Sequence, residues 1–190
     1  GTGALTIAPY SINRPTRINS GGAGLSISTP EIAFIQNGWS NLYIGRDDGT
    51  NTLHIGDSTW YDPVTFRNHG AHDMSGALSM MDGASVSFLN GWIDFYGSIT
   101  TDGGGLSIST NRADTADVNY DAGRMFLGNG SSINTNGGAI SFQRFVPVSG
   151  TFSVNSGGGQ IRFNSLLDQS YSTSNVNVTL NAGTGQIRFD

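Results

Sequence analysis

The aspartates are the residues of this chain best suited to acid–base chemistry, and their spacing decides whether they can perform it. Hydrolases that cleave polysaccharides need two or three carboxylates close together, and Asp62, Asp94, Asp102 and Asp121 are the candidates. These aspartates are scattered along the chain, and aspartates in turns commonly accept hydrogen bonds from their own backbone. The sequence therefore predicts no catalytic residue and no enzyme, with a polysaccharide-cleaving protein as the alternative.

Three short motifs resemble binding sites for metals or phosphate, and each is incomplete. The segment 46–49, Arg-Asp-Asp-Gly, lacks the alternating oxygen ligands of a calcium loop and is interpreted as a tight turn. His69, His72 and Asp73 have metal-like spacing, but no further ligand is indicated, and the chain has no cysteine. The segment 128–130, Gly-Asn-Gly, lacks the lysine and the helix of a phosphate loop. We therefore expect no metal and no cofactor.

The large aromatic residues are the candidates for contacts with a ligand or a partner. The motif Asn-Gly-Trp occurs twice and ends at Trp39 and at Trp92, and Trp60 and Tyr96 are further candidates. Exposed aromatic rings can stack on sugar rings or dock a neighbouring subunit. The alternative is that these rings fill or cap the hydrophobic core.

Composition limits which elements can carry these residues. The chain has 190 residues with 28 glycines, no lysine, a single glutamate at Glu31 and a net charge of −5. Such a composition favours turns and short strands over helices. The nine arginines form no basic stripe, which argues against a nucleic-acid partner. No apolar run approaches the roughly 20 residues of a membrane span, and the start without methionine favours a processed or excised segment.

Internal repetition is the strongest signal in the sequence. A phrase of glycines followed by apolar–polar–apolar residues recurs at 3–7, 22–29, 104–110, 137–142, 158–163 and 185–189. Leu5 and Leu25 hold the same place in two successive phrases, as do Ile140 and Ile161. Repeats of this length with short alternating strands are typical of a solenoid. The sequence predicts an all-β, right-handed parallel β-helix (β-solenoid) with about eight or nine coils of roughly 20 residues, and an antiparallel sandwich is the alternative.

Two segments interrupt the repeat without dividing the chain. Residues 30–41 have the only helix-like spacing and predict a single turn or a short loop flap. Residues 111–123 are polar and predict a protruding loop. Since no linker separates two parts, we expect residues 1–190 to form a single domain.

The phrases Leu-Ser-Ile-Ser-Thr at 25–29 and 106–110, the stretch 42–66 and the final stretch 178–190 resemble repeats of filamentous-haemagglutinin-like bacterial surface proteins, a cyanobacterial-type family. The resemblance implies a β-helix, export to the cell surface, and a role in a surface fibre or adhesin. The Asn-Pro-Asn-Leu and Asn-Pro-Asn-Gly-Ile motifs of that family's secretion domain do not occur in this sequence. The chain therefore resembles the stalk of such a protein.

These observations together predict an extracellular structural segment. We expect it to bind copies of itself, or further repeats of a longer chain, along the solenoid axis, with Leu5, Ile7, Ile187 and Phe189 at the end-to-end contact. Surface glycans are a second candidate partner. Ice-binding solenoids present regular Thr-x-Thr rows, whereas threonine is placed irregularly in this chain. A carbohydrate-binding or polysaccharide-cleaving β-helix remains the alternative function.

Overall fold

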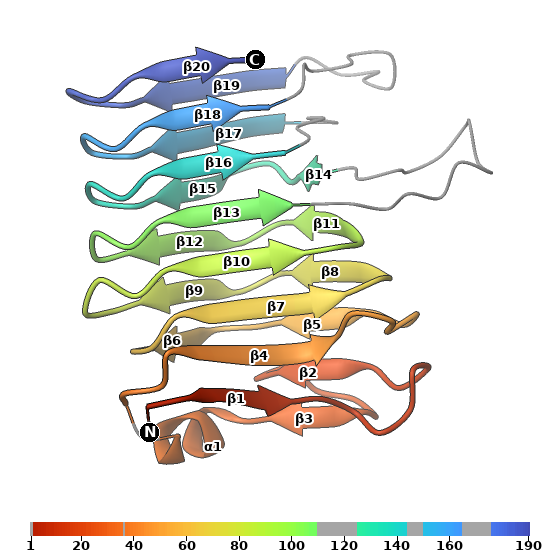
Figure 1. The fold of residues 1–190 in the computed structure, drawn as a ribbon. Coiled ribbons are helices and arrows are strands. Elements are labelled where there is room, and N and C mark those ends of the chain that lie inside the picture. Colours follow the sequence, from red (N-terminus) through yellow and green to blue (C-terminus); the bar gives the residue numbers. More distant parts are fainter. Residues whose placement is uncertain (1, 36, 110–124, 144–149, 165–175) are drawn as a thin grey trace.

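Three parallel sheets, stacked coil upon coil, make up almost all of the computed structural model, which describes residues 2–35, 37–109, 125–143, 150–164 and 176–190 (Figure 1). Sheet A has eight strands, in the order β1 (Ala4–Ile7), β4 (Asn41–Arg46), β7 (Val64–Asn68), β10 (Val86–Leu89), β13 (Leu106–Ser109), β16 (Ile140–Phe142), β18 (Ile161–Phe163) and β20 (Ile187–Phe189). The strands of this sheet lie at the front of the figure.

The two remaining sheets have six strands each and lie behind sheet A (Figure 1). Sheet B has the order β14 (Met125–Leu127), β11 (Trp92–Phe95), β8 (Ala71–Met74), β5 (Leu53–Ile55), β2 (Thr16–Ile18) and β3 (Leu25–Ile27). Sheet C has the order β19 (Val176–Asn181), β17 (Gly150–Asn155), β15 (Ser131–Asn134), β12 (Ser98–Thr101), β9 (Ala77–Met80) and β6 (Ser58–Trp60).

The chain visits the three sheets in turn and rises by one strand spacing per coil. β7, β8 and β9, for example, lie in sheets A, B and C and are followed by β10, again in sheet A. In Figure 1 the front strands run left to right, the rear strands run back, and the chain climbs from the N-terminus to the C-terminus. The solenoid is therefore right-handed and all strand pairs in the described residues are parallel, as the sequence predicted.

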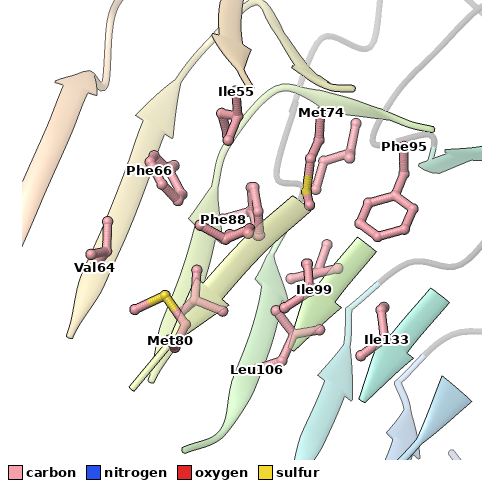
Figure 2. Packing of buried hydrophobic residues seen from close by; sticks show 14 of the residues in the cluster. Ile55, Val64, Phe66, Met74, Met80, Phe88, Phe95, Ile99, Leu106 and Ile133 are labelled. Atoms are coloured by element: carbon pink, nitrogen blue, oxygen red, sulfur yellow. The ribbon is translucent and has the colours of Figure 1, made fainter. Parts of the chain in front are cut away.

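The core consists of apolar residues in columns that run along the solenoid axis (Figure 2). Alternation along each strand turns every second side chain inward, and the register places like residues above one another. One column of sheet A contains Ile7, Ile44, Phe66, Phe88, Ile108, Phe142, Phe163 and Phe189. The rings of Phe142 and Phe163 stack 5.0 Å apart, and those of Phe163 and Phe189 are 4.9 Å apart.

At the corner between sheets C and A, a residue with a side-chain hydroxyl and a glycine recur in successive coils. Thr101, Thr135 and Ser156 are buried, and each hydroxyl donates a hydrogen bond to the carbonyl three residues later, across the turn. Glycines at 104, 138 and 159 follow these residues and stack closely. A Cβ on Gly138 would come within 2.0 Å of the carbonyl oxygen of Gly104. Only glycine allows consecutive coils to approach this closely.

The predicted count of eight or nine coils was too high, because the structure has about five turns. Four successive coils, from β4 to β15, place a strand in each of the three sheets. Other segments of the chain are longer than one coil: Ala4 pairs with Asn41, and the intervening residues include β2, β3 and α1 (Thr29–Phe34). A count based on a uniform repeat could not allow for these insertions.

The segment predicted as a single turn or loop flap contains α1, which lies at the N-terminal end of the solenoid (Figure 1). Ser28 and Glu31 form a capping box, in which the Glu31 carboxylate accepts a hydrogen bond of 2.7 Å from the Ser28 N–H. Ile32 is buried in the core cluster, and α1 contacts β6 of sheet C. The helix therefore covers part of this end of the core.

One repeated phrase proved to have two positions in the fold. The identical segments at 25–29 and 106–110 were treated as equivalent, but Leu25 lies in sheet B and Leu106 lies in sheet A. Leu25 pairs with Thr16, whereas Leu5 pairs with Leu42. The phrase specifies a short strand with one face inward, and such a strand fits any of the three sheets.

None of the helices within the described residues is long and apolar enough to cross a bilayer.

Candidate functional site

The outer face of sheet B brings together ionisable side chains that are far apart in the sequence. His54 and Asp94 each stand between two buried apolar residues, and Asp73 stands between the buried His72 and Met74. These neighbours point inward, so His54, Asp73 and Asp94 point outward. The register pairs His54 with Asp73 and Asp73 with Asp94. Adjacent strands are about 4.8 Å apart. We call these three residues the sheet B column.

The two lower members of the sheet B column are joined by a direct contact. Nδ1 of His54 lies 2.9 Å from Oδ2 of Asp73, and both side chains are partly exposed. Arg17 pairs with His54 in the next strand down, but its guanidinium donates to the carbonyls of Gly21 and Ala23 at 2.8 and 2.9 Å. The positively charged guanidinium of Arg17 is therefore hydrogen-bonded within the turn between β2 and β3. The two upper members of the column, Asp73 and Asp94, are both carboxylates.

Aromatic side chains flank the upper carboxylate along β11. Trp92, Asp94 and Tyr96 occupy alternate positions, and the residues between them, Ile93 and Phe95, are fully buried. Trp92 is partly exposed, and Tyr96 keeps 52% of its surface exposed. We call Trp92, Asp94 and Tyr96 the β11 row. Its two aromatic residues lie about 13 Å apart along the strand.

A glycine in the next coil makes room for the Tyr96 ring. A Cβ on Gly128 would come within 2.3 Å of Cδ1 of Tyr96. The ring therefore packs over the backbone of the following coil, and the rest of its surface faces solvent. This support fixes the ring more firmly than that of an unsupported surface tyrosine.

The side chains of this surface are hydrogen-bond acceptors and aromatic rings. Carboxylates accept hydrogen bonds from hydroxyl groups, and aromatic rings offer an apolar surface to the C–H faces of a ligand. Among the described residues, no group of three or more His, Cys, Asp or Glu side chains is arranged to hold a metal ion.

The predicted contact aromatics have different environments. Trp60 is 2% exposed and packs edge-on against Phe66 in the core, with ring centroids 6.4 Å apart. It cannot contact a partner, since its position at the end of β6 points it inward. Trp39 is partly buried and packs against the core cluster. Trp92 and Tyr96 are brought together on the β11 row.

Three of the aspartates considered as candidate acids, Asp62, Asp94 and Asp102, lie in the described part of the chain, and they occupy separate places in it. Asp62 is buried and accepts a hydrogen bond of 2.8 Å from the Gly38 N–H. Asp102 lies in the exposed turn after β12, and Asp94 belongs to the sheet B column. Asp121 falls outside the described residues, as does the loop predicted at 111–123. The pair of carboxylates on neighbouring strands is Asp73 with Asp94, which sequence reasoning did not identify.

The segment 46–49 forms a turn in which arginines face the carboxylates. Arg46 makes two hydrogen bonds of 2.8 Å to Asp48, and Arg67 contacts Asp47 at 3.1 Å. The Gly49 N–H donates to the Arg46 carbonyl at 3.1 Å. The carboxylates are therefore used in ion pairs at the surface, consistent with the interpretation as a turn.

The histidines at 69 and 72 lie on opposite sides of the solenoid wall. His69 is exposed, whereas His72 is fully buried and occupies the inward position between Leu53 and Ile93. Asp73, the next residue, points outward. Alternation within β8 puts the side chains of His72 and Asp73 on opposite faces of the sheet, and His69 lies before the strand. The segment 128–130 forms a turn, with the Gly130 N–H donating to the Thr151 carbonyl.

The residues predicted for the end-to-end contact lie on the outermost strands of sheet A. Ile187 and Phe189 of β20 are 42% and 51% exposed. Leu5 and Ile7 of β1 are partly buried and pack against the core cluster.

A signal for the sheet B column was present in the sequence. The spacing from His54 to Asp73 and the spacing from Asp73 to Asp94 are each close to one coil, and His54 and Asp94 each stand between two apolar residues. An alignment of the coils on their polar residues, as well as on their apolar residues, would have placed His54, Asp73 and Asp94 in one column. The contact between His54 and Asp73 also depends on the strand register, which the spacing alone does not give.

Comparison of the chain with protein-family models, with curated protein sequences and with solved structures gives no significant match.

Proposed function

We propose that the chain is a structural segment of an extracellular bacterial surface filament or adhesin, in which solenoids associate head to tail along their axis. The observation that carries the proposal is the continuity of the inner columns of sheet A, which run through all eight strands from β1 to β20. Each coil buries its apolar residues against the next coil, so the architecture can be extended along its axis by the same contacts.

The exposed edge of sheet A supports an axial contact. β20 presents Ile187 and Phe189 with about half of their surfaces exposed, and Phe189 stacks on Phe163 with one face only. An edge strand with unpaired backbone groups and apolar side chains is a template for pairing with another strand. At the opposite end, β1 has the same alternation, with Leu5 and Ile7 inward.

The short helix restricts how two solenoids can meet. Since α1 lies beside β6 at the N-terminal end, it occupies the side of sheet C, whereas β1 is the edge of sheet A. We therefore place the contact between β20 of one copy and β1 of the next. A contact of this head-to-tail kind does not close and generates an open filament.

The family resemblance and the extracellular location are part of this proposal. They rest on the glycine-led repeat phrases and on the absence of cysteine and lysine from the sequence. No catalytic step is included in the proposal.

Association is tested by sedimentation velocity on the 190-residue chain over a range of concentrations. We expect growing species for the unmodified chain and a monomer for Phe189→Asp, because a carboxylate at the edge of β20 would be buried in the contact. Met81→Asp is the matched control, since Met81 is 39% exposed and lies between β9 and β10, away from the outermost strands of all three sheets. Circular dichroism verifies that both variants are folded. A chain that stays monomeric at all concentrations, or equal loss of association in both variants, contradicts the proposal.

A further inference from the structure

Sheet A and sheet C stop at different levels at both ends of the solenoid. At the N-terminal end, sheet A begins with β1, whereas sheet C begins one coil later with β6, which belongs to the coil of β4. At the C-terminal end, β19 belongs to the coil of β18, and β20 lies one coil further along the axis. Within the described residues, sheet A therefore extends one coil beyond sheet C at each end, which accounts for its eight strands against six.

These steps matter for the head-to-tail contact of the proposed function, which we assume here. When β1 of an upper copy lies directly on β20 of a lower copy, two successive coils lack a strand in sheet C. The space lies between β19 of the lower copy and β6 of the upper copy, and at about 4.8 Å per coil it is about 10 Å long. An α-helix with its side chains is about 10–12 Å wide. The upper copy already has a helix at this place, because α1 contacts β6 at the N-terminal end (Figure 1).

We propose that α1 is the contact element of the N-terminal end and packs on β19 of the copy below it. Ile32 of this helix enters the core cluster of its own copy. Phe34 lies two residues further along, which is about 200° around the helix. Its ring therefore points away from the core that Ile32 enters, and it is 83% exposed. The apolar face that α1 turns away from its own solenoid is thus formed by Phe34.

The surface that receives α1 is the free edge of β19 in the lower copy. Val178 and Leu180 lie over the buried Phe152 and Val154 in the inward columns of sheet C, and both remain partly exposed. Among the described strands, β19 is the outermost strand of its sheet at this end. The Phe34 ring covers these two side chains and removes apolar surface of both copies from water.

Charges do not oppose this contact. Glu31 is the ionisable residue of α1, and its carboxylate accepts hydrogen bonds of 2.7 Å from both the N–H and the hydroxyl of Ser28. The outward residues of β19 are uncharged, namely Asn177, Thr179 and Asn181. Burial of an unpaired charge is costly, and the described side chains of α1 and β19 bring none into the contact.

The same placement continues the inward columns of sheet A. In the register that all neighbouring coils share, Leu5 of the upper copy lies over Ile187 of the lower copy, and Ile7 lies over Phe189. The Phe189 ring stacks on Phe163 on its inner side and is 51% exposed. β1 therefore covers the end of sheet A while α1 covers the end of sheet C, so that the two contacts form one interface.

A mixing experiment tests the role of α1. Phe34→Asp blocks the N-terminal end and Phe189→Asp blocks the C-terminal end, because each carboxylate would be buried in the contact. In sedimentation velocity, we expect each variant alone to associate at least about tenfold more weakly than the unmodified chain. An equimolar mixture of the two variants should form a species of twice the monomer mass and nothing larger, since one intact end of each kind is present.

Two further variants control for other effects of the substitution. Phe34→Lys should behave like Phe34→Asp, although a cation is favourable and an anion unfavourable at the C-terminal end of a helix. Met81→Asp, at an exposed residue between β9 and β10, should associate like the unmodified chain. Circular dichroism and thermal unfolding verify that each variant is folded.

The outcomes separate this inference from the proposed function. Undiminished association of Phe34→Asp and Phe34→Lys, in a chain that otherwise assembles, would overturn the role of α1 and leave the head-to-tail filament standing. A mixture that stays monomeric, although the unmodified chain associates, would show that the two ends do not meet and would overturn both. An unmodified chain that is monomeric at all concentrations would contradict the proposed function, and the role of α1 with it.

Discussion

At the scale of single residues, the buried histidine is the most unusual feature of the core. His72 is completely buried in an inward column, where it lies between Leu53 and Ile93. Its Nε2 lies 3.2 Å from the Asn90 carbonyl, and its Nδ1 has no hydrogen-bond partner within the described residues. Burial lowers the pKa of His72 to about 4, although backbone groups of Asn90, Leu89 and Asn68 favour the protonated ring and raise the pKa.

This histidine predicts how stability depends on pH. Its folded pKa of about 4 lies below the ordinary value of 6.5, so the unfolded chain binds the additional proton between these values. Stability is therefore fully present above pH 6.5 and falls as the pH decreases towards 4, by about 3 kcal/mol. Urea unfolding at several pH values measures this change.

A matched pair of variants tests the assignment to His72. His72→Leu should flatten the pH dependence between about 4 and 6.5, whereas His69→Leu, at an exposed histidine, should leave it unchanged. Hydrogen bonds from Ser28, Arg46 and Arg162 lower the pKa values of Glu31, Asp48 and Asp190. An unchanged slope in His72→Leu would show that another group is responsible.

At the scale of elements, the turns between sheets C and A set the distance between coils. The hydroxyls of Thr101, Thr135 and Ser156 satisfy one carbonyl in each of these turns, and glycines let the turns stack. An unsatisfied buried carbonyl costs roughly 1–3 kcal/mol. The corner residues therefore contribute to stability as directly as the apolar columns do.

The close approach of the turns makes a specific prediction. Gly138→Ala should destabilise the chain by about 1–3 kcal/mol or more, because its Cβ would lie 2.0 Å from the backbone oxygen of Gly104, which cannot move without shifting a coil. Gly21→Ala is the control, since a Cβ there meets no atom within 4 Å. Thermal unfolding compares the two variants. Equal melting temperatures would mean that the coils are not packed as described.

The elements also show what could be predicted from sequence. The inward alternation of Phe142, Phe163 and Phe189 was predicted correctly, because apolar–polar–apolar triplets with glycines before them specify a strand and its buried face. The sheet to which Leu25 belongs was not predictable, since the same phrase fits sheet A or sheet B. Trp60 was considered as a contact residue because the pattern Ser-Thr-Trp does not reveal which of its faces is inward.

At the scale of the whole molecule, the parallel β-solenoid was predictable and its irregularities were not. Repetition of the phrase at a nearly constant spacing indicated stacked coils. The number of turns was overestimated because β3 and α1 lengthen the chain between β1 and β4. The arrangement of side chains on the outer face of sheet B depends on the register of five strands, β2, β5, β8, β11 and β14. The sequence alone shows the outward polar residues of these strands but not how the strands are aligned.

The solenoid is uniform along its axis and differs between its sides. The inner columns continue from coil to coil, whereas the outer face of sheet B carries the aromatic and acidic side chains. Axial association would repeat this face at regular intervals along a filament.

The central claim is that copies of the solenoid associate along their axis, and electron cryo-microscopy of the concentrated chain tests it most directly. We predict filaments one solenoid wide, in which strands lie across the filament axis and continue over the junction between copies at a spacing of about 4.8 Å. Discrete single particles at high concentration, or filaments in which the solenoid axes lie across the filament, would contradict the claim.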